Sequence, residues 1–310
     1  MPALTRPALD PLAAEKFRQA GRVAGEARRI GASLIRPGTP LREVMEAVEA
    51  FIYSQDALPA FPAQTSRNHI AAHYCPHPGD TTVYQEGDMV KIDIGAAVDG
   101  FVGDTAETIY LGTEPVYQRL VDASRNALSA AIRAAGPGIR VNDISAAIEK
   151  EIDGLGFCPV YNLTGHGVDR WKVHTAPQIP PSPDPYSDIQ LQPGMVIAIE
   201  PFATDGRGQV YEKGRAEVFM IVRNPRRMKG VDPAFWEVVE GMNGLPFARR
   251  TFPACIPRDV VENSLARLIR MGSLMAFAPL VDPDPAVRIS QCEHTLLITE
   301  DGAEVLTGVS

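Results

Sequence analysis

The chain has 310 residues, 45% of them hydrophobic and 22% charged, which is typical of a globular protein. Its formal net charge of −8 argues against a general nucleic-acid-binding protein, because such proteins are usually basic. No apolar run approaches the ~20 residues that span a bilayer, and the N-terminal "MPALTRPALDPLA" lacks the apolar core of a signal peptide. We therefore expect no membrane partner, no specific nucleic-acid partner and a cytoplasmic location.

Four helices are predicted before residue 160. An amphipathic pattern over about residues 11–34 ends at "RPGTP", where Thr39 and Pro40 suit an N-cap and a first helical position. The second helix follows with apolar residues at helical spacing. A third helix is predicted over 116–135, "GPG" ends it, and a fourth begins at "VNDISAAIEKEIDGLGF".

These helices form part of an internal repeat. Pro37-Gly38 aligns with Pro137-Gly138, and the next helices then match at apolar positions. "QEGDMVKIDIG" (85–95) also resembles "QPGMVIAIEP" (192–201), and this alignment places Asp93 opposite Glu200. Chance similarity between two helix–helix–strand units is the alternative.

The stretch "VKIDIGAAVDGFVGDTAETIYLG" predicts a β-hairpin whose turn is Asp99-Gly100. If those residues form the turn, alternation places Asp93 and Asp104 on one face as diagonal neighbours. Two carboxylates so close are destabilising without a cation, whereas a solvated face with two unimportant aspartates is the alternative. The small side chains of Gly95 and Ala106 leave room beside them.

Later segments offer further ligands. His166 lies between glycines in "NLTGHGV", and Glu200 and Glu293 are predicted within strands. Alternation places His294 on the face opposite Glu293, so we do not expect it to be a ligand. Four carboxylates and one imidazole favour a pair of divalent ions such as Mn, Co, Fe or Zn over one tetrahedral structural zinc.

Two other features need separate interpretation. His69, His73 and His77 have helical spacing, but Pro76 and Pro78 favour strand or loop there. Residues from about 224 to 276 are predicted to be helical and fall outside the repeat, so we interpret them as an insertion. The four cysteines form no CxxC pair, and free thiols are expected.

The motifs together resemble those of the pita-bread metallopeptidases, specifically the methionine aminopeptidases of type 2. The resemblance spans about residues 12–310 and rests on "AAHYCPHPGDTTV", "VKIDIGAAVDGFVGDTAETI", "TGHGV", "AIEPFATDGRG" and "QCEHTLLI". The helical insertion is typical of type 2, and the absence of a Lys-rich extension is similar to the archaeal subgroup. It implies an α+β pita-bread fold in a single domain, residues 1–310, with a pseudo-two-fold repeat and an antiparallel sheet covered by helices.

The resemblance also implies the roles of individual residues. Asp93 would bind one ion, Asp104 and Glu293 would bridge two, and His166 and Glu200 would bind the other. His73 and His174 would contact substrate near the scissile bond. An apolar pocket for the methionine side chain would involve Phe61, Phe202 and Phe277, although a tyrosine is common in the family at Phe277.

These roles predict removal of the N-terminal methionine from nascent proteins. A water activated by two ions would attack the carbonyl, Glu200 would take and pass the proton, and His73 and His174 would stabilise the intermediate. Type 2 relatives imply a monomer that meets the ribosome only transiently. The alternatives are an X-Pro-type peptidase, whose relatives usually carry an extra N-terminal domain, and a non-catalytic pita-bread binding protein that has lost metal ligands.

Overall fold

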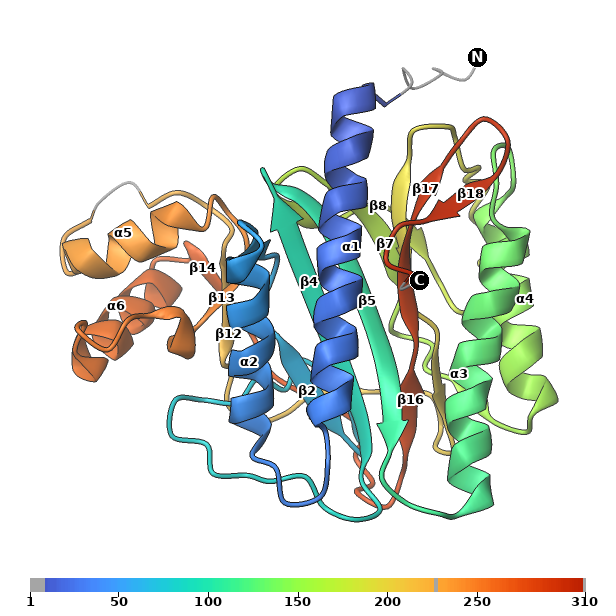
Figure 1. The fold of residues 1–310 in the computed structure, drawn as a ribbon, viewed down its shortest axis with the longest axis horizontal. Coiled ribbons are helices and arrows are strands. Elements are labelled where there is room, and N and C mark those ends of the chain that lie inside the picture. Colours follow the sequence, from blue (N-terminus) through green and yellow to red (C-terminus); the bar gives the residue numbers. More distant parts are fainter. Residues whose placement is uncertain (1–8, 226–227, 309–310) are drawn as a thin grey trace.

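The computed structural model describes residues 9–225 and 228–308 (Figure 1). The first eight residues of the N-terminal stretch quoted above, and part of the predicted insertion, lie outside these ranges. No helix in the described ranges is long and apolar enough to cross a membrane.

Six α-helices are present in the described ranges. Their bounds are α1 Pro11–Leu34, α2 Leu41–Ser54, α3 Pro115–Ala134, α4 Val141–Gly154, α5 Pro233–Gly241 and α6 Arg258–Arg270. The first four match the predicted helices closely, but the predicted start of α2 is wrong. Pro40 occupies the N-cap position, because Thr39 is held in extended pairing by the Tyr84 backbone amide, which donates to its carbonyl at 3.0 Å.

The main sheet has nine strands, and every pairing in it is antiparallel. Its central path runs β1-β4-β5-β17-β9-β7-β8, with β2 paired to β4 and β18 paired to β17. The bounds are β1 Leu58–Pro59, β2 Gln64–Arg67, β4 Met89–Val98, β5 Phe101–Tyr110, β7 Gly165–Asp169, β8 Lys172–Ile179, β9 Val196–Ile199, β17 Glu293–Ile298 and β18 Ala303–Val305.

Three small sheets complete the strand structure. Their orders are β16-β10-β6, β11-β15-β3 and β13-β12-β14. The bounds are β3 Ile70–Ala72, β6 Cys158–Pro159, β10 Phe202–Thr204, β11 Tyr211–Glu212, β12 Val218–Ile221, β13 Phe247–Ala248, β14 Leu274–Phe277, β15 Leu280–Val281 and β16 Ile289–Gln291.

The internal repeat is visible in the backbone. Gly38 and Gly138 both have positive φ and both donate a backbone hydrogen bond of 2.8 Å to a later extended segment, at Tyr84 and Leu191. Helices α2 and α4 then follow with the same length of 14 residues. Chance similarity of the two segments does not explain such equivalent hydrogen bonds.

Helices α1 to α4 cover one face of the main sheet, as Figure 1 shows. Ile92 and Ile94 of β4 are buried beneath α1 and α2, while Ile197 of β9 and Leu296 of β17 are buried beneath α3 and α4. Because successive strand residues point to opposite faces, Asp93 points away from these helices. The helices bury one face of the sheet, and the other face remains available for a site.

Residues 216–225 and 228–277 form a small separate layer beside the sheet, at the left of Figure 1. It consists of the β13-β12-β14 sheet with α5 and α6. Its own apolar cluster includes Phe219, Phe235 and Leu268, which are fully buried or nearly so. Val218 and Phe277, paired across β12 and β14, lie at the edge of this layer and face the main pocket.

Candidate metal centre and substrate pocket

The hairpin of β4 and β5 has the predicted register. Val98 pairs with Phe101, and the turn residues Asp99 and Gly100 have φ values of 51° and 86°, as a type I′ turn requires. Asp93 pairs with Ala106, and Asp104 pairs with Gly95. The two aspartates are therefore diagonal neighbours on one face of the sheet, and the alternative of a solvated face is wrong because both line one pocket.

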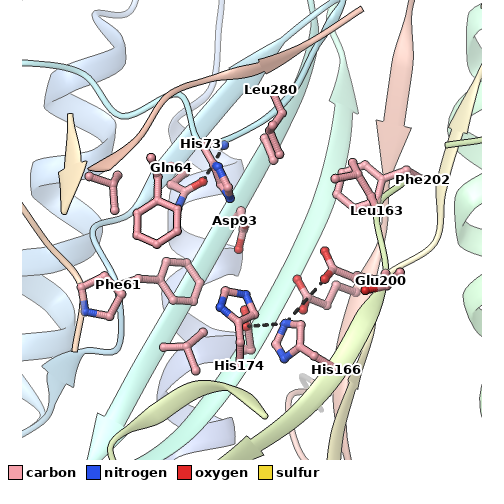
Figure 2. A pocket seen from close by; sticks show the side chains of 18 of the residues that line it. Phe61, Gln64, His73, Asp93, Leu163, His166, His174, Glu200, Phe202 and Leu280 are labelled. Carbon is pink, nitrogen blue, oxygen red and sulfur yellow. Dashed lines mark hydrogen bonds and ion pairs between the residues drawn. The ribbon is translucent and has the colours of Figure 1, made fainter. Parts of the chain in front are cut away.

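A cavity of about 250 Å³ opens on this face (Figure 2). All ten residues singled out from the sequence line it. They are Phe61, His73, Asp93, Asp104, His166, His174, Glu200, Phe202, Phe277 and Glu293. They come from segments spread from residue 61 to residue 293, so the tertiary fold alone brings them together.

His166 lies at the centre of the acidic residues. Its Nε2 is 3.5 Å from Glu200 Oε1 and 3.8 Å from Asp104 Oδ2, and its Nδ1 lies 3.1 Å from the Gly167 carbonyl oxygen. Ligand atoms of Asp104, His166 and Glu293 all lie within 4.8 Å of one another. Contact of Nδ1 with a carbonyl is the arrangement that leaves Nε2 free as a ligand atom.

Glu200 is not part of a strand, contrary to the sequence prediction. Strand β9 ends at Ile199, and Glu200 and Pro201 form the link to β10. Proline lacks the amide hydrogen that ladder pairing needs, so the ladder ends here. Gln291 of β16 donates to Glu200 Oε2 at 3.3 Å and orients it instead.

Burial dominates the electrostatics of the carboxylates. Desolvation raises the pKa of Asp93 to about 7, and it raises the pKa of Asp104 well above its usual range, with further repulsion from Asp93. The pKa values of Glu200 and Glu293 are also raised well above normal, first by burial and then by the charge of Asp104. The protein alone therefore does not stabilise four ionised carboxylates here.

The histidines of the pocket are held neutral for a related reason. Burial, and then the neighbouring His174, lower the pKa of His166 to about 3 and that of His73 to about 4. Burial also lowers the pKa of His174, whose ring packs edge-on against His166 at 4.3 Å between centroids. A neutral imidazole is the form that binds a metal or accepts a proton.

The donor set fits divalent metal ions. Asp93 Oδ1 and Asp104 Oδ1 are buried and have no hydrogen-bond partner among the described residues, and no Lys or Arg lines the cavity. Buried carboxylates in this state need a counter-charge. Four oxygen donors and one imidazole supply ligands that Mn, Fe, Co or Zn accept.

His73 is fixed by a residue that the sequence analysis missed. Its φ is +65°, and its backbone amide donates to Gln64 Oε1 at 2.8 Å. Its ring packs edge-on against Phe277, with 5.8 Å between centroids, and its buried Nδ1 has no partner among the described residues. The contact links β2 to the residue that follows β3, and nothing in the sequence near Gln64 signals this role.

The apolar lining comes from separate clusters. Val218 and Phe277 pack together, Phe61 belongs to another cluster, and Phe202 packs with Leu163 and Leu280. We call Phe61, Val218, Pro246 and Phe277 the first lobe, and Leu163, Phe202 and Leu280 the second lobe. Figure 2 shows Phe61 and Phe202 on opposite sides, with His166 and His174 between them. The three phenylalanines singled out from the sequence therefore do not share one wall.

Comparison with known proteins agrees with this geometry. The model of metallopeptidase family M24 matches residues 15–300. A curated relative, the methionine aminopeptidase of Thermococcus onnurineus, is 41% identical over 294 residues, which cover 94% of this chain and 99% of that protein.

Solved structures place the fold. The crystal structure of methionine aminopeptidase from Thermotoga maritima superposes on this chain with a TM-score of 0.73 and 28% sequence identity. The match covers 99% of this chain and 100% of the Thermotoga chain. Prolidase from Pyrococcus furiosus has a TM-score of 0.63 at 21% identity, with 98% of this chain and 66% of that chain covered, and so supports the fold alone. The predicted pita-bread fold is confirmed. The extent of the family match and the identity to the Thermococcus protein establish that the chain belongs to metallopeptidase family M24.

Proposed function

We propose that this chain is a metallo-aminopeptidase that removes the initiator methionine from the N-terminus of newly made proteins. The observation that carries the proposal is the near-complete match to proteins named methionine aminopeptidase, at 41% identity for the Thermococcus relative, together with one pocket that unites the acids, the histidines and apolar lobes. The fold by itself would not distinguish this activity from others on the same scaffold.

Family membership and the pocket chemistry support the use of divalent metal. We propose two ions. Asp93 would hold one, Asp104 and Glu293 would contact both, and His166 and Glu200 would hold the other. Bound at this position, divalent ions supply a lowered pKa for a water molecule and a counter-charge for the carbonyl oxygen of the substrate.

The protein's own groups handle protons and orientation. Glu200 takes a proton and returns it to the leaving amine, a role that suits a carboxyl whose pKa is raised by burial. His73 offers a buried, unpartnered Nδ1 to the peptide. The ring of His174 packs against that of His166. Their hydrogen bonds polarise the peptide and stabilise the charge that develops on it.

The lobes provide the binding energy for the substrate. The first lobe, with Phe61 and Phe277, would take the unbranched thioether side chain of the substrate. Phe202, in the second lobe, contacts the substrate on the other side of the acids. Burying a methionine side chain contributes about 1.5–3 kcal/mol.

Other features of the proposal concern the whole chain. We propose that residues 1–310 act as a single catalytic domain, with about 224–276 as the insertion typical of type 2 enzymes. The protein would act as a monomer in the cytoplasm and would meet the ribosome transiently, because its substrate is the N-terminus of nascent polypeptides.

A pair of peptides tests the proposal. Mn²⁺-loaded protein is expected to release methionine from Met-Ala-Ser and to leave Ala-Pro uncleaved. Asp104→Ala is expected to abolish both this release and Mn²⁺ binding. Asp301→Asn, between β17 and β18 and outside the pocket lining, should change neither. Cleavage of Ala-Pro alone would support an X-Pro peptidase, and wild-type protein that binds Mn²⁺ but cleaves neither peptide would support a binding protein.

A further inference from the structure

One buried cation lies outside the catalytic machinery. Arg250 belongs to a 3₁₀ helix, η1 Arg249–Thr251, in the layer formed by residues 216–225 and 228–277. Its side chain is only 3% exposed, although arginine is almost never fully buried without partners. The partners explain its position.

The Arg250 side chain makes five hydrogen bonds, and all of its partners lie outside its own layer. Nη2 donates to Glu49 Oε1 at 2.5 Å and to the Ala63 carbonyl at 2.7 Å, and Nε lies 3.1 Å from Glu49 Oε2. Nη1 donates to Cys75 Sγ at 2.5 Å and to the Pro76 carbonyl at 3.2 Å. We call this set of residues the Arg250 junction.

Glu49 extends the junction. Besides pairing with the guanidinium, its Oε1 accepts from the Ala63 amide at 2.9 Å. Glu49 lies on α2, so the junction ties together a helix and two loops that are distant in sequence. A guanidinium can satisfy several acceptors at once because its donors have a fixed planar arrangement, which a lysine cannot reproduce.

The connected segments carry the walls of the first apolar lobe. Ala63 lies between Phe61 and Gln64, and Cys75 lies two residues after His73. The walls are in direct contact here, because Cys75 packs against Val218 and Ala248, with Phe277 beside them.

The strand register completes the connection on the side of Arg250. Val218 pairs with Phe277 on one neighbouring strand and with Ala248 on the other. Ala248 immediately precedes η1. The guanidinium therefore joins the wall that contains Phe277 to the wall that contains Phe61.

We propose that Arg250, through Glu49, sets the width of the first lobe and thereby the selection of a methionine side chain. Arg250 is a positioning residue, because it touches no pocket atom itself. The inference rests on the proposed function. An apolar pocket discriminates between side chains by close packing, and one misfitting group lowers kcat/KM by about 10–200-fold. If a wall of the pocket shifts, the packing loosens and part of this discrimination is lost.

The neighbouring arginine provides a matched control. Arg249 donates to Glu262 at 2.7 Å and to the Ala216 carbonyl at 2.6 Å, and it pairs with Glu217 at 3.1 Å. All of these partners lie between residues 216 and 262. Arg249 therefore stabilises its own layer, whereas Arg250 attaches that layer to the rest of the molecule.

The experiment compares Arg250→Lys, Glu49→Gln and Arg249→Lys as Mn²⁺-loaded proteins. Peptides that begin with methionine, leucine or alanine and continue Ala-Ser are assayed for kcat and KM. For the first two variants we expect the KM of the methionine peptide to rise about tenfold, with little change in kcat. Preference for methionine over leucine and alanine should fall, while Mn²⁺ affinity by calorimetry should not change. Arg249→Lys should keep the preference.

Three results separate this inference from the proposed function. Unchanged preference in Arg250→Lys and Glu49→Gln, or an equal loss in Arg249→Lys, would overturn the inference while leaving the activity intact. If wild type cleaves no methionine peptide, the proposed function fails. In that case calorimetry compares the affinities of wild type and Arg250→Lys for free L-methionine and L-leucine. The inference requires that Arg250→Lys prefers methionine over leucine less strongly than wild type does. If circular dichroism shows that Arg250→Lys does not fold, Glu49→Gln decides, because it keeps the shape and an acceptor.

Discussion

Replacing Asp93 by Asn should stabilise the metal-free protein, and at pH 5 it should destabilise the protein when metal is bound. In the metal-free protein, burial raises the pKa of Asp93 from 3.8 to about 7. A carboxyl whose folded pKa is raised loses stability as the pH rises from the unfolded pKa through the folded one. At about 1.4 kcal/mol per pKa unit, the cost is about 2 kcal/mol at pH 5 and about 4 kcal/mol at pH 8.

The amide of Asp93→Asn does not ionise, so the variant escapes this cost. In EDTA we therefore expect the variant to gain stability over wild type, and that gain should grow by roughly 2–3 kcal/mol between pH 5 and pH 8. Histidine titrations affect both proteins alike and cancel in the difference. Mn²⁺ at 100 Kd stabilises wild type by about 2.7 kcal/mol, and it stabilises the variant less because the variant lacks one ligand. At pH 5 this reverses the order of stability, and at pH 8 it reduces the gain of the variant.

Urea titrations at pH 5 and pH 8, in EDTA and in Mn²⁺, measure these free energies of unfolding. Asp99→Asn serves as the control, because Asp99 lies in the turn of the same hairpin and is exposed. It should show no gain in stability in EDTA at either pH. A constant difference between wild type and Asp93→Asn across the pH range would refute the reasoning that a buried, metal-dependent carboxylate occupies this position.

Two further substitutions test the packing of the pocket. Gln64→Leu removes the acceptor of the His73 amide and should lower kcat/KM for a methionine peptide by about 10–100-fold. Gln64→Glu keeps an acceptor and should retain most activity. Equal losses in both variants would contradict the positioning role of Gln64. Gly95→Ala would bring a Cβ within 2.4 Å of the phenyl ring in the first lobe and should lower the free energy of unfolding by about 1–3 kcal/mol. At Gly154 no atom lies within 4 Å of an added Cβ, so Gly154→Ala should be neutral or slightly stabilising. Thermal or urea denaturation measures the stability of both variants. Similar losses in Gly95→Ala and Gly154→Ala would show that crowding is not the cause.

Local patterns determined much of this protein. Helical spacing located α1 to α4, and the Asp99-Gly100 turn determined the register that places Asp93 and Asp104 on one face. Turn chemistry and side-chain alternation act over a few residues, so they can be inferred from the chain alone. The internal repeat aligned Glu200 with Asp93 and so predicted a carboxylate at the equivalent position. That Glu200 lies after strand β9, beside Pro201, depended on where the backbone pairing of that strand ends.

Only the tertiary structure decided how the pocket is held. Gln64 reaches His73 across two strands, Gln291 orients Glu200, and Arg250 reaches Glu49 from about 200 residues away. The division of the phenylalanines into two lobes is of the same kind. Apart from the Gln64–His73 contact, which spans nine residues, each depends on the distance between segments that are remote in the chain. Such distances follow from the packing of whole layers, and no local periodicity encodes them.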